Sequence, residues 1–106
     1  MTYNAKVTFD NIEKGNGFCA PDLPADIKSA VYKSTQQVFE GRDPIFVGCG
    51  GSIPFMEVFS QEFPSANFLL TGCATMTGNA HCANENIDLE YCKKFITAIA
   101  LTLSNI

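Results

Sequence analysis

Residues 44–54 read PIFVGCGGSIP, and this stretch decides the fold class that the sequence predicts. Ile45 to Val47 is a short continuous apolar run, which is typical of a strand buried on both faces. The glycine-rich turn 48–52 follows it and leads into a helix over residues 54–63. Residues 67–71 form a second apolar run of the same kind. A strand, a crossover helix and another strand in this order predict two parallel neighbours in one sheet.

Two further helices and one further strand surround this unit in the sequence. Apolar residues at helical spacing predict helices over about 23–40 and 88–104, and Gly41 ends the first of them. Residues 3–9 alternate between apolar and polar side chains, which is the pattern of a half-buried strand. We therefore predict a mixed α/β class with parallel strands. Phe55, Met56, Phe59 and Phe63 lie at helical spacing and are interpreted as core.

The composition is that of an ordinary globular protein with a mild negative charge. The 106 residues suit one domain, and the formal net charge is −4. The seven Lys and Arg residues are scattered, which argues against a nucleic-acid partner. The sequence shows neither a secretory leader nor an apolar segment that could span a bilayer. Five cysteines without a CxxC pair argue against a disulfide framework and predict a cytoplasmic protein.

Two loops follow the carboxyl ends of the predicted parallel strands, where open α/β sheets bind their ligands. In the first loop, Gly50, Gly51 and Ser52 precede a helix N-terminus. The free N–H groups there can hold a carboxylate or another anion, with the Ser52 hydroxyl as an added donor. The same residues also suit a tight strand-to-helix turn that Ser52 caps, and both interpretations stand.

The second loop, residues 72–85, carries His81, the single histidine of the chain. A lone histidine is more often a structural or surface residue than a metal ligand or a catalytic base. Cys73 and Cys82 lie near it in the sequence, but the paired spacings of a four-ligand structural zinc site are absent. A Cys–His nucleophile pair is a further alternative, and nothing singles out one cysteine for it.

Together the two loops resemble a known family. GGSIP at residues 50–54, then Asn79-Ala80-His81 and Asn84-Glu85, is similar to the C-terminal signature of the dinuclear-zinc peptidases, which include carnosinases, other dipeptidases, aminoacylases and acetylornithine deacetylases. The resemblance extends from about Tyr3 to the end of the chain. It implies a partial three-layer α/β/α domain, in which residues 1–12 are the last strand of an inserted lid domain and residues 13–106 the C-terminal part of the catalytic domain.

The resemblance also implies roles for the two loops. The histidine that matches His81 binds one zinc ion, and the serine that matches Ser52 grips the substrate carboxylate together with the amides of Gly50 and Gly51. The substrates are small peptides or N-acyl amino acids, whose amide bond is cleaved by a metal-activated water. The family's zinc pair also needs an early His-x-Asp and an adjacent Glu-Glu, and this chain has neither.

We therefore expect a C-terminal fragment of a zinc-dependent dipeptidase or amidohydrolase, with weak or no zinc binding and no activity as the isolated chain. No catalytic residue is assigned within it. A stand-alone non-catalytic module, or a partner subunit with the same partial fold, is the alternative. A cut catalytic domain leaves apolar surface uncovered, which favours self-association or binding to the missing N-terminal part of that domain. A small Cys–His hydrolase or transferase is a third hypothesis.

Overall fold

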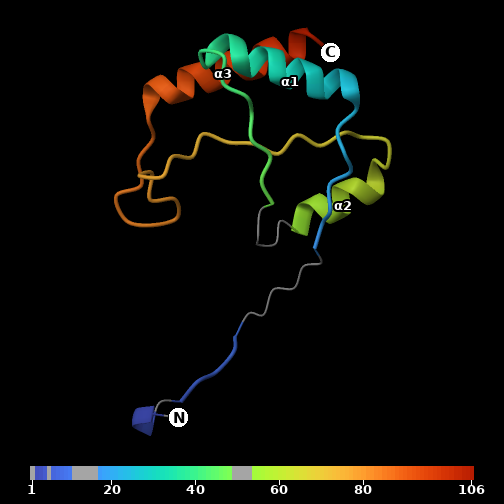
Figure 1. Ribbon diagram of the computed structural model, residues 1–106. Helices are drawn as coiled ribbons and strands as arrows, with labels where there is room; N and C mark the ends of the chain where they lie inside the picture. The colour runs from blue at the N-terminus through green and yellow to red at the C-terminus, as the bar shows by residue number, and fades with distance from the viewer. Residues whose placement is uncertain (1, 5, 11–16, 49–53) are drawn as a thin grey trace. The chain divides into compact units, whose positions relative to one another are not determined.

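The computed structural model describes residues 2–4, 6–10, 17–48 and 54–106. Its helices are the 3-10 helix η1 (Thr2–Asn4), α1 (Ala25–Val38), α2 (Pro54–Glu62) and α3 (Leu89–Ser104) (Figure 1). The three α-helices lie where helical spacing predicted them, and their ends shift by about two residues or fewer, which is the usual uncertainty of a helix end. Over the described ranges, no helix is long and apolar enough to cross a membrane.

The ends of α1 follow from local residues. Pro24 precedes the helix with a φ of −51°, and Asp26 lies in the first turn, where its charge suits the positive end of the helix dipole. At the other end, Glu40 and Gly41 have left-handed φ values of 58° and 82°. The Gly41 N–H donates to the carbonyl of Gln36 at 2.8 Å. A left-handed turn of this kind satisfies a free carbonyl and stops the helix.

The ends of α3 are set by two side chains that replace missing backbone partners. Asp88 is the N-cap, and its Oδ1 accepts the backbone N–H groups of Glu90 and Tyr91, each at 3.0 Å. At the C-terminus, the Asn105 side chain donates to the carbonyl of Leu101 at 2.6 Å. Caps of this kind satisfy backbone groups that have no partner within the helix, so the helix begins and ends at defined residues.

The contact between α1 and α3 holds the buried core of the described chain (Figure 1). Ala30, Val31 and Ser34 are the buried residues of α1, and Ala98 and Thr102 are those of α3. These side chains are short, so the two helix backbones can approach closely. The buried Thr102 hydroxyl donates to the carbonyl of Ala98 at 2.8 Å, which satisfies it within its own helix.

Contacts beyond this core show that the two helices run antiparallel. The Phe39 ring, just after α1, lies 5.8 Å from the Tyr91 ring near the start of α3, centroid to centroid. Next to it, Lys94 Nζ lies 3.4 Å from Glu40 Oε1, with side chains 48% and 77% exposed. Because an exposed ion pair contributes little, the aromatic contact is the stronger of the two.

The predicted α/β class is wrong for this structure, because the described residues contain three α-helices and no strand. Residues 44–48 and 67–72 run as non-helical connections, green and gold in Figure 1. Ile45 is 86% exposed and Val47 is 79% exposed, where the prediction had a strand buried on both faces. A strand needs backbone hydrogen bonds from a neighbour, and none joins these two segments to each other. The partial three-layer α/β/α arrangement with parallel strands is therefore absent from the described residues.

The predicted N-terminal strand is also absent. Residues 2–4 form η1, in which Tyr3 has a φ of 66°, and residues 6–10 have no regular structure. Val7 and Phe9 are 61% and 83% exposed. Alternating apolar and polar residues specify a strand only where a sheet and a core receive the apolar face, and the described residues supply neither here.

The chain divides into two compact units that are each built from two separate stretches. One unit comprises residues 1–19 and 49–66, and the other comprises residues 20–48 and 67–106. The second unit contains α1 and α3, and the first contains α2. The assignment of residues 1–12 to a lid domain and 13–106 to a catalytic domain stays a prediction.

The phenylalanine rings along one face of α2 and just after it contact one another. The ring centroids of Phe55 and Phe59 lie 5.2 Å apart, and those of Phe59 and Phe63 lie 4.7 Å apart. Phe55 is nevertheless 62% exposed and Phe63 is 53% exposed. The helical spacing therefore brings the rings together, as expected for residues on one face, while much of this surface stays accessible.

Candidate functional site

His81 lies in a loop whose two ends are joined by hydrogen bonds. The backbone N–H of Asn86 donates to the carbonyl of Gly78 at 2.9 Å, and its side chain donates to the carbonyl of Thr77 at 2.9 Å. Gly78 donates in turn to Thr75 at 3.0 Å. A Cβ at Gly78 would lie 3.2 Å from the Thr75 oxygen and 3.3 Å from the Asn86 oxygen. The loop therefore closes tightly because this position has no side chain.

The imidazole of His81 is exposed at the tip of this loop. The residue has a φ of 63°, and Asn79 and Asn84 on either side of it have φ values of 52° and 60°. Left-handed backbone is uncommon outside glycine and is several-fold enriched in Asn, Asp and His. Within the described ranges, no hydrogen bond or ion pair occupies the His81 ring. The loop thus presents an unengaged imidazole to solvent.

The described residues do not form a zinc site around His81. They contain no group of three or more His, Cys, Asp or Glu side chains placed to hold one metal ion. A catalytic zinc takes three protein ligands and a structural zinc takes four. His81 is therefore a single candidate ligand among the described residues. The roles predicted for Gly50, Gly51 and Ser52 lie outside the described residues and stay a prediction.

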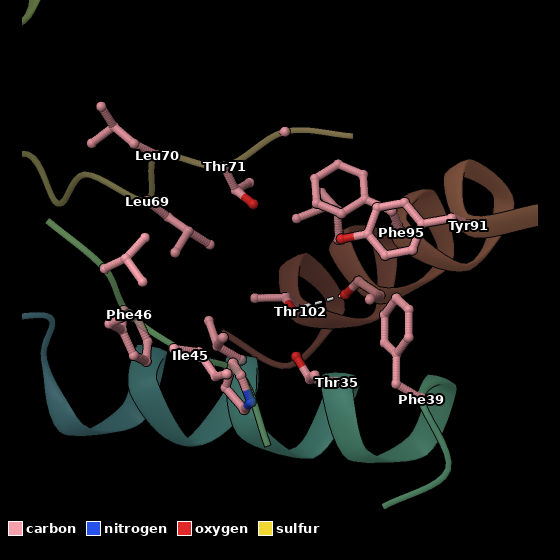
Figure 2. A pocket seen from close by; sticks show the side chains of 16 residues that line it. Thr35, Phe39, Ile45, Phe46, Leu69, Leu70, Thr71, Tyr91, Phe95 and Thr102 are labelled. Carbon is pink, nitrogen blue, oxygen red and sulfur yellow. Dashed lines mark hydrogen bonds between the residues drawn. The ribbon is translucent and has the colours of Figure 1, made fainter. Parts of the chain in front are cut away.

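A groove of about 490 Å³ lies within the unit that contains α1 and α3. Figure 2 shows its walls, which come from both helices and from the two non-helical segments 44–47 and 69–72. Its 16 lining residues include three threonines and Tyr91 but no charged side chain and no histidine. The groove can therefore receive apolar surface, and it offers no group for acid–base chemistry at neutral pH. Sequence reasoning missed it, because the apolar runs that form its walls were interpreted as strands of a sheet.

Two thiols meet beside the His81 loop. Cys73 lies at the start of the loop 72–85 and Cys92 lies in the first turn of α3, and the Cys73 thiol donates to the Cys92 sulfur at 3.7 Å. The pKa of Cys73 is raised above its ordinary value, chiefly because its surroundings shield it from water. Its hydrogen bond to Cys92 and the charge of a Cys92 thiolate raise that pKa further. Sequence reasoning did not find this pair, since the two residues are 19 positions apart.

The Cys–His nucleophile hypothesis gains no support from the part of the chain that the structure describes. Cys82 neighbours His81 in the sequence and is exposed. No hydrogen bond joins it, or any other described cysteine, to the imidazole. A nucleophile and its base must lie within hydrogen-bond reach. The thiols that do meet are a different pair.

Comparison with known proteins gives one partial similarity. The chain is 36% identical over 56 residues to a cysteinylglycine-S-conjugate dipeptidase from Corynebacterium striatum. The matched part covers 53% of this chain and spans 12% of the length of that relative. No family model matches, and no solved structure matches. The chain is thus distantly similar to part of a dipeptidase.

Proposed function

We propose that this chain is a C-terminal segment of a zinc-dependent dipeptidase or amidohydrolase, an enzyme that hydrolyses the amide bond of a small peptide or an N-acyl amino acid. The observation that carries the proposal is the 36% identity to a dipeptidase over 56 residues. The order and spacing of the GGSIP and NAH motifs support the same class of enzyme. The odd number of cysteines, five, favours a cytoplasmic location.

In this proposal His81 is one metal ligand. An exposed imidazole on a tightly closed loop is accessible to an ion, and neutral histidine is the commonest metal ligand in proteins. The remaining ligands and the general base would come from residues that the described part of the chain does not contain. We accordingly propose that the isolated chain binds zinc weakly and hydrolyses no dipeptide. The relative, of which the match spans 12%, is long enough to hold such residues elsewhere.

The glycine-rich turn is proposed to hold the substrate carboxylate. Helix α2 begins at Pro54, two positions after Ser52 in the sequence. Backbone N–H groups at a helix N-terminus favour negative charge, so a carboxylate there would be stabilised. The Ser52 hydroxyl would add one donor.

A stand-alone non-catalytic module is the second candidate, and the helix pair is the observation that favours it. α1 and α3 bury their own contact, and the groove beside them can receive apolar surface from a different partner protein. Sedimentation at several protein concentrations separates the two candidates. A monomer at all concentrations, with no gain of activity on adding other segments, favours the module.

The decisive experiment compares the chain alone with the chain joined to its upstream reading frame. We expect no hydrolysis of a cysteinylglycine S-conjugate by the chain alone and chelator-sensitive hydrolysis by the longer protein. In the longer protein, His81→Asn should abolish zinc-dependent activity, because it removes the imidazole. Asparagine suits this position because it tolerates left-handed backbone. Met76→Ala is the matched control, since Met76 is a fully exposed residue of the same loop.

Two results would contradict the proposal. Chelator-sensitive peptidase activity of the purified chain alone would show that it needs no further ligands. An upstream reading frame without in-phase His-x-Asp and Glu-Glu motifs would remove the source of the missing metal site.

A further inference from the structure

The proposed function does not use the two thiols that meet beside the His81 loop. Cys73 Sγ lies 3.7 Å from Cys92 Sγ, and both residues are half-buried. A disulfide bond is about 2.05 Å long, so the sulfurs need to approach by roughly 1.7 Å for the bond to form. Cys19 and Cys82 are exposed, and among the described residues neither makes a hydrogen bond to another sulfur.

The two thiols are already near each other before any reaction, and backbone hydrogen bonds fix Cys92 and part of the segment between the two cysteines. Cys92 lies in α3, where its N–H donates to the carbonyl of the N-cap Asp88 at 2.9 Å. On the other side, the hydrogen bond from Asn86 to Gly78 closes the segment between the two cysteines. Groups held in place in this way react as if at high local concentration, because the entropy of bringing them together has already been lost.

We propose that Cys73 and Cys92 form a reversible disulfide when the protein meets a low-molecular-weight disulfide, and that this bond locks the segment that carries His81. One protein thiolate attacks a sulfur of the small disulfide and releases one small thiolate. The second protein thiolate then attacks the protein sulfur of the mixed disulfide and releases the other. Two protein thiols are oxidised and the small disulfide is reduced to two thiols, which take up the two protons.

The raised pKa of Cys73 disfavours it as the first attacker, and part of that rise disappears once Cys92 is in a mixed disulfide, because the charge of the Cys92 thiolate is then gone. A thiol that keeps its proton is a poor first attacker, since the thiolate is the nucleophile. Once a mixed disulfide forms on Cys92, however, Cys73 is already placed beside it. The inference depends on these two thiols alone, so it holds or fails independently of whether His81 binds a metal.

The first experiment locates the disulfide in the unmodified chain. The protein is incubated with oxidised glutathione, free thiols are alkylated, and the sample is digested with a glutamyl endoprotease for mass spectrometry. This enzyme separates residues 63–85 from residues 91–106, whereas trypsin leaves four cysteines on one peptide because no Lys or Arg lies between Arg42 and Lys93. We expect these two peptides to be joined as the main product.

A Cys82→Ser variant assigns the bond, since residues 63–85 also contain Cys82. The linkage should persist in Cys82→Ser and disappear in Cys73→Ser and in Cys92→Ser. A main product that involves Cys19, Cys49 or Cys82 would overturn the proposal. So would stable mixed disulfides on Cys73 and Cys92 without a bond between them. The mapping of the unmodified chain needs no variant to fold.

The second experiment measures how much the disulfide stabilises the protein. Oxidation should raise the midpoint of thermal unfolding by about 5 °C or more, because a bond across this loop restricts the unfolded chain. Cys82→Ser should show the same rise, and Cys73→Ser should show none. Loss of the rise in Cys82→Ser, or an equal rise in Cys73→Ser, would contradict the proposed pair.

Discussion

The helix pair α1–α3 and the two non-helical segments 44–48 and 67–72 were predicted from equally clear apolar patterns, yet only the helices formed. Each helix satisfies its backbone within about four residues, and caps such as Asp88 satisfy its ends. A strand cannot satisfy its backbone locally, because its hydrogen-bond partners lie on another strand. Ile45 and Val47 therefore stay more than three-quarters exposed despite a pattern typical of buried strands.

The difference shows what an apolar run specifies. Each helix needs cover on one face only, and the contact between α1 and α3 buries small residues of that face, among them Ala30, Val31 and Ala98. Ile96 and Leu103 of α3 stay more than half exposed. In residues 44–48 the run is continuous, so it needs cover on two faces and a backbone partner on each edge. Residues 44–47 form one wall of a groove instead of a buried strand.

The largest expected effect comes from breaking the helix pair at its centre. Ala98 is 7% exposed, and Ala98→Asp would bury an unpaired charge between α1 and α3. We expect the free energy of unfolding to fall by about 3 kcal/mol or more. Urea unfolding followed by circular dichroism measures it. Ala100→Asp is the matched control at an exposed position of the same helix, and its loss should be about 1 kcal/mol or less. Equal losses would show that this contact is not the core.

A smaller effect is expected in the loop between the second segment and α3. Gly78→Ala places a methyl group 3.2 Å and 3.3 Å from two backbone oxygens, and should cost about 1–2 kcal/mol of loop stability. Faster hydrogen exchange of the Asn86 amide would report the opening. Gly72→Ala is the control, because a Cβ there meets nothing within 4 Å. If both variants leave Asn86 equally protected, the loop does not depend on Gly78.

Removing one cap tests the claim that local groups specify the helices. Asp88→Ala should lower the free energy of unfolding by about 1 kcal/mol, because the amides of Glu90 and Tyr91 lose their acceptor. Asp88→Asn should retain most of the stability, since asparagine caps about as well as aspartate. Denaturant unfolding of the three proteins gives the comparison. An Asn variant as unstable as the Ala variant would point to charge rather than capping.

The smallest effect is expected in the segment that was predicted as a buried strand. Val47→Thr should change the free energy of unfolding by less than about 0.5 kcal/mol, since Val47 is 79% exposed. The same substitution at Val31, which is 8% exposed, should cost about 1–2 kcal/mol because it buries a hydroxyl. Parallel thermal and urea unfolding of both variants measures the contrast. A larger loss at Val47 would restore the case for a buried strand.

The candidate site was predictable in part. The sequence identifies His81 as the single histidine and places it in a long loop, and the structure shows that loop with the imidazole exposed. How the loop closes could not be read from the sequence, because it depends on Asn86 reaching back to Thr77 and Gly78. The thiol pair was equally hidden, since Cys73 and Cys92 are brought together by the packing of a loop against a helix.

The sequence by itself determined the positions of the three α-helices, the single imidazole and the local signals at helix ends, because each depends on residues a few positions apart. It also carries the similarity to a dipeptidase. Only the tertiary structure decided that the apolar runs line a groove instead of pairing as strands, and that Cys73 and Cys92 meet among the cysteines that the structure describes. Those outcomes depend on which distant segments lie side by side, and hydrophobicity alone does not choose between partners because it has no direction.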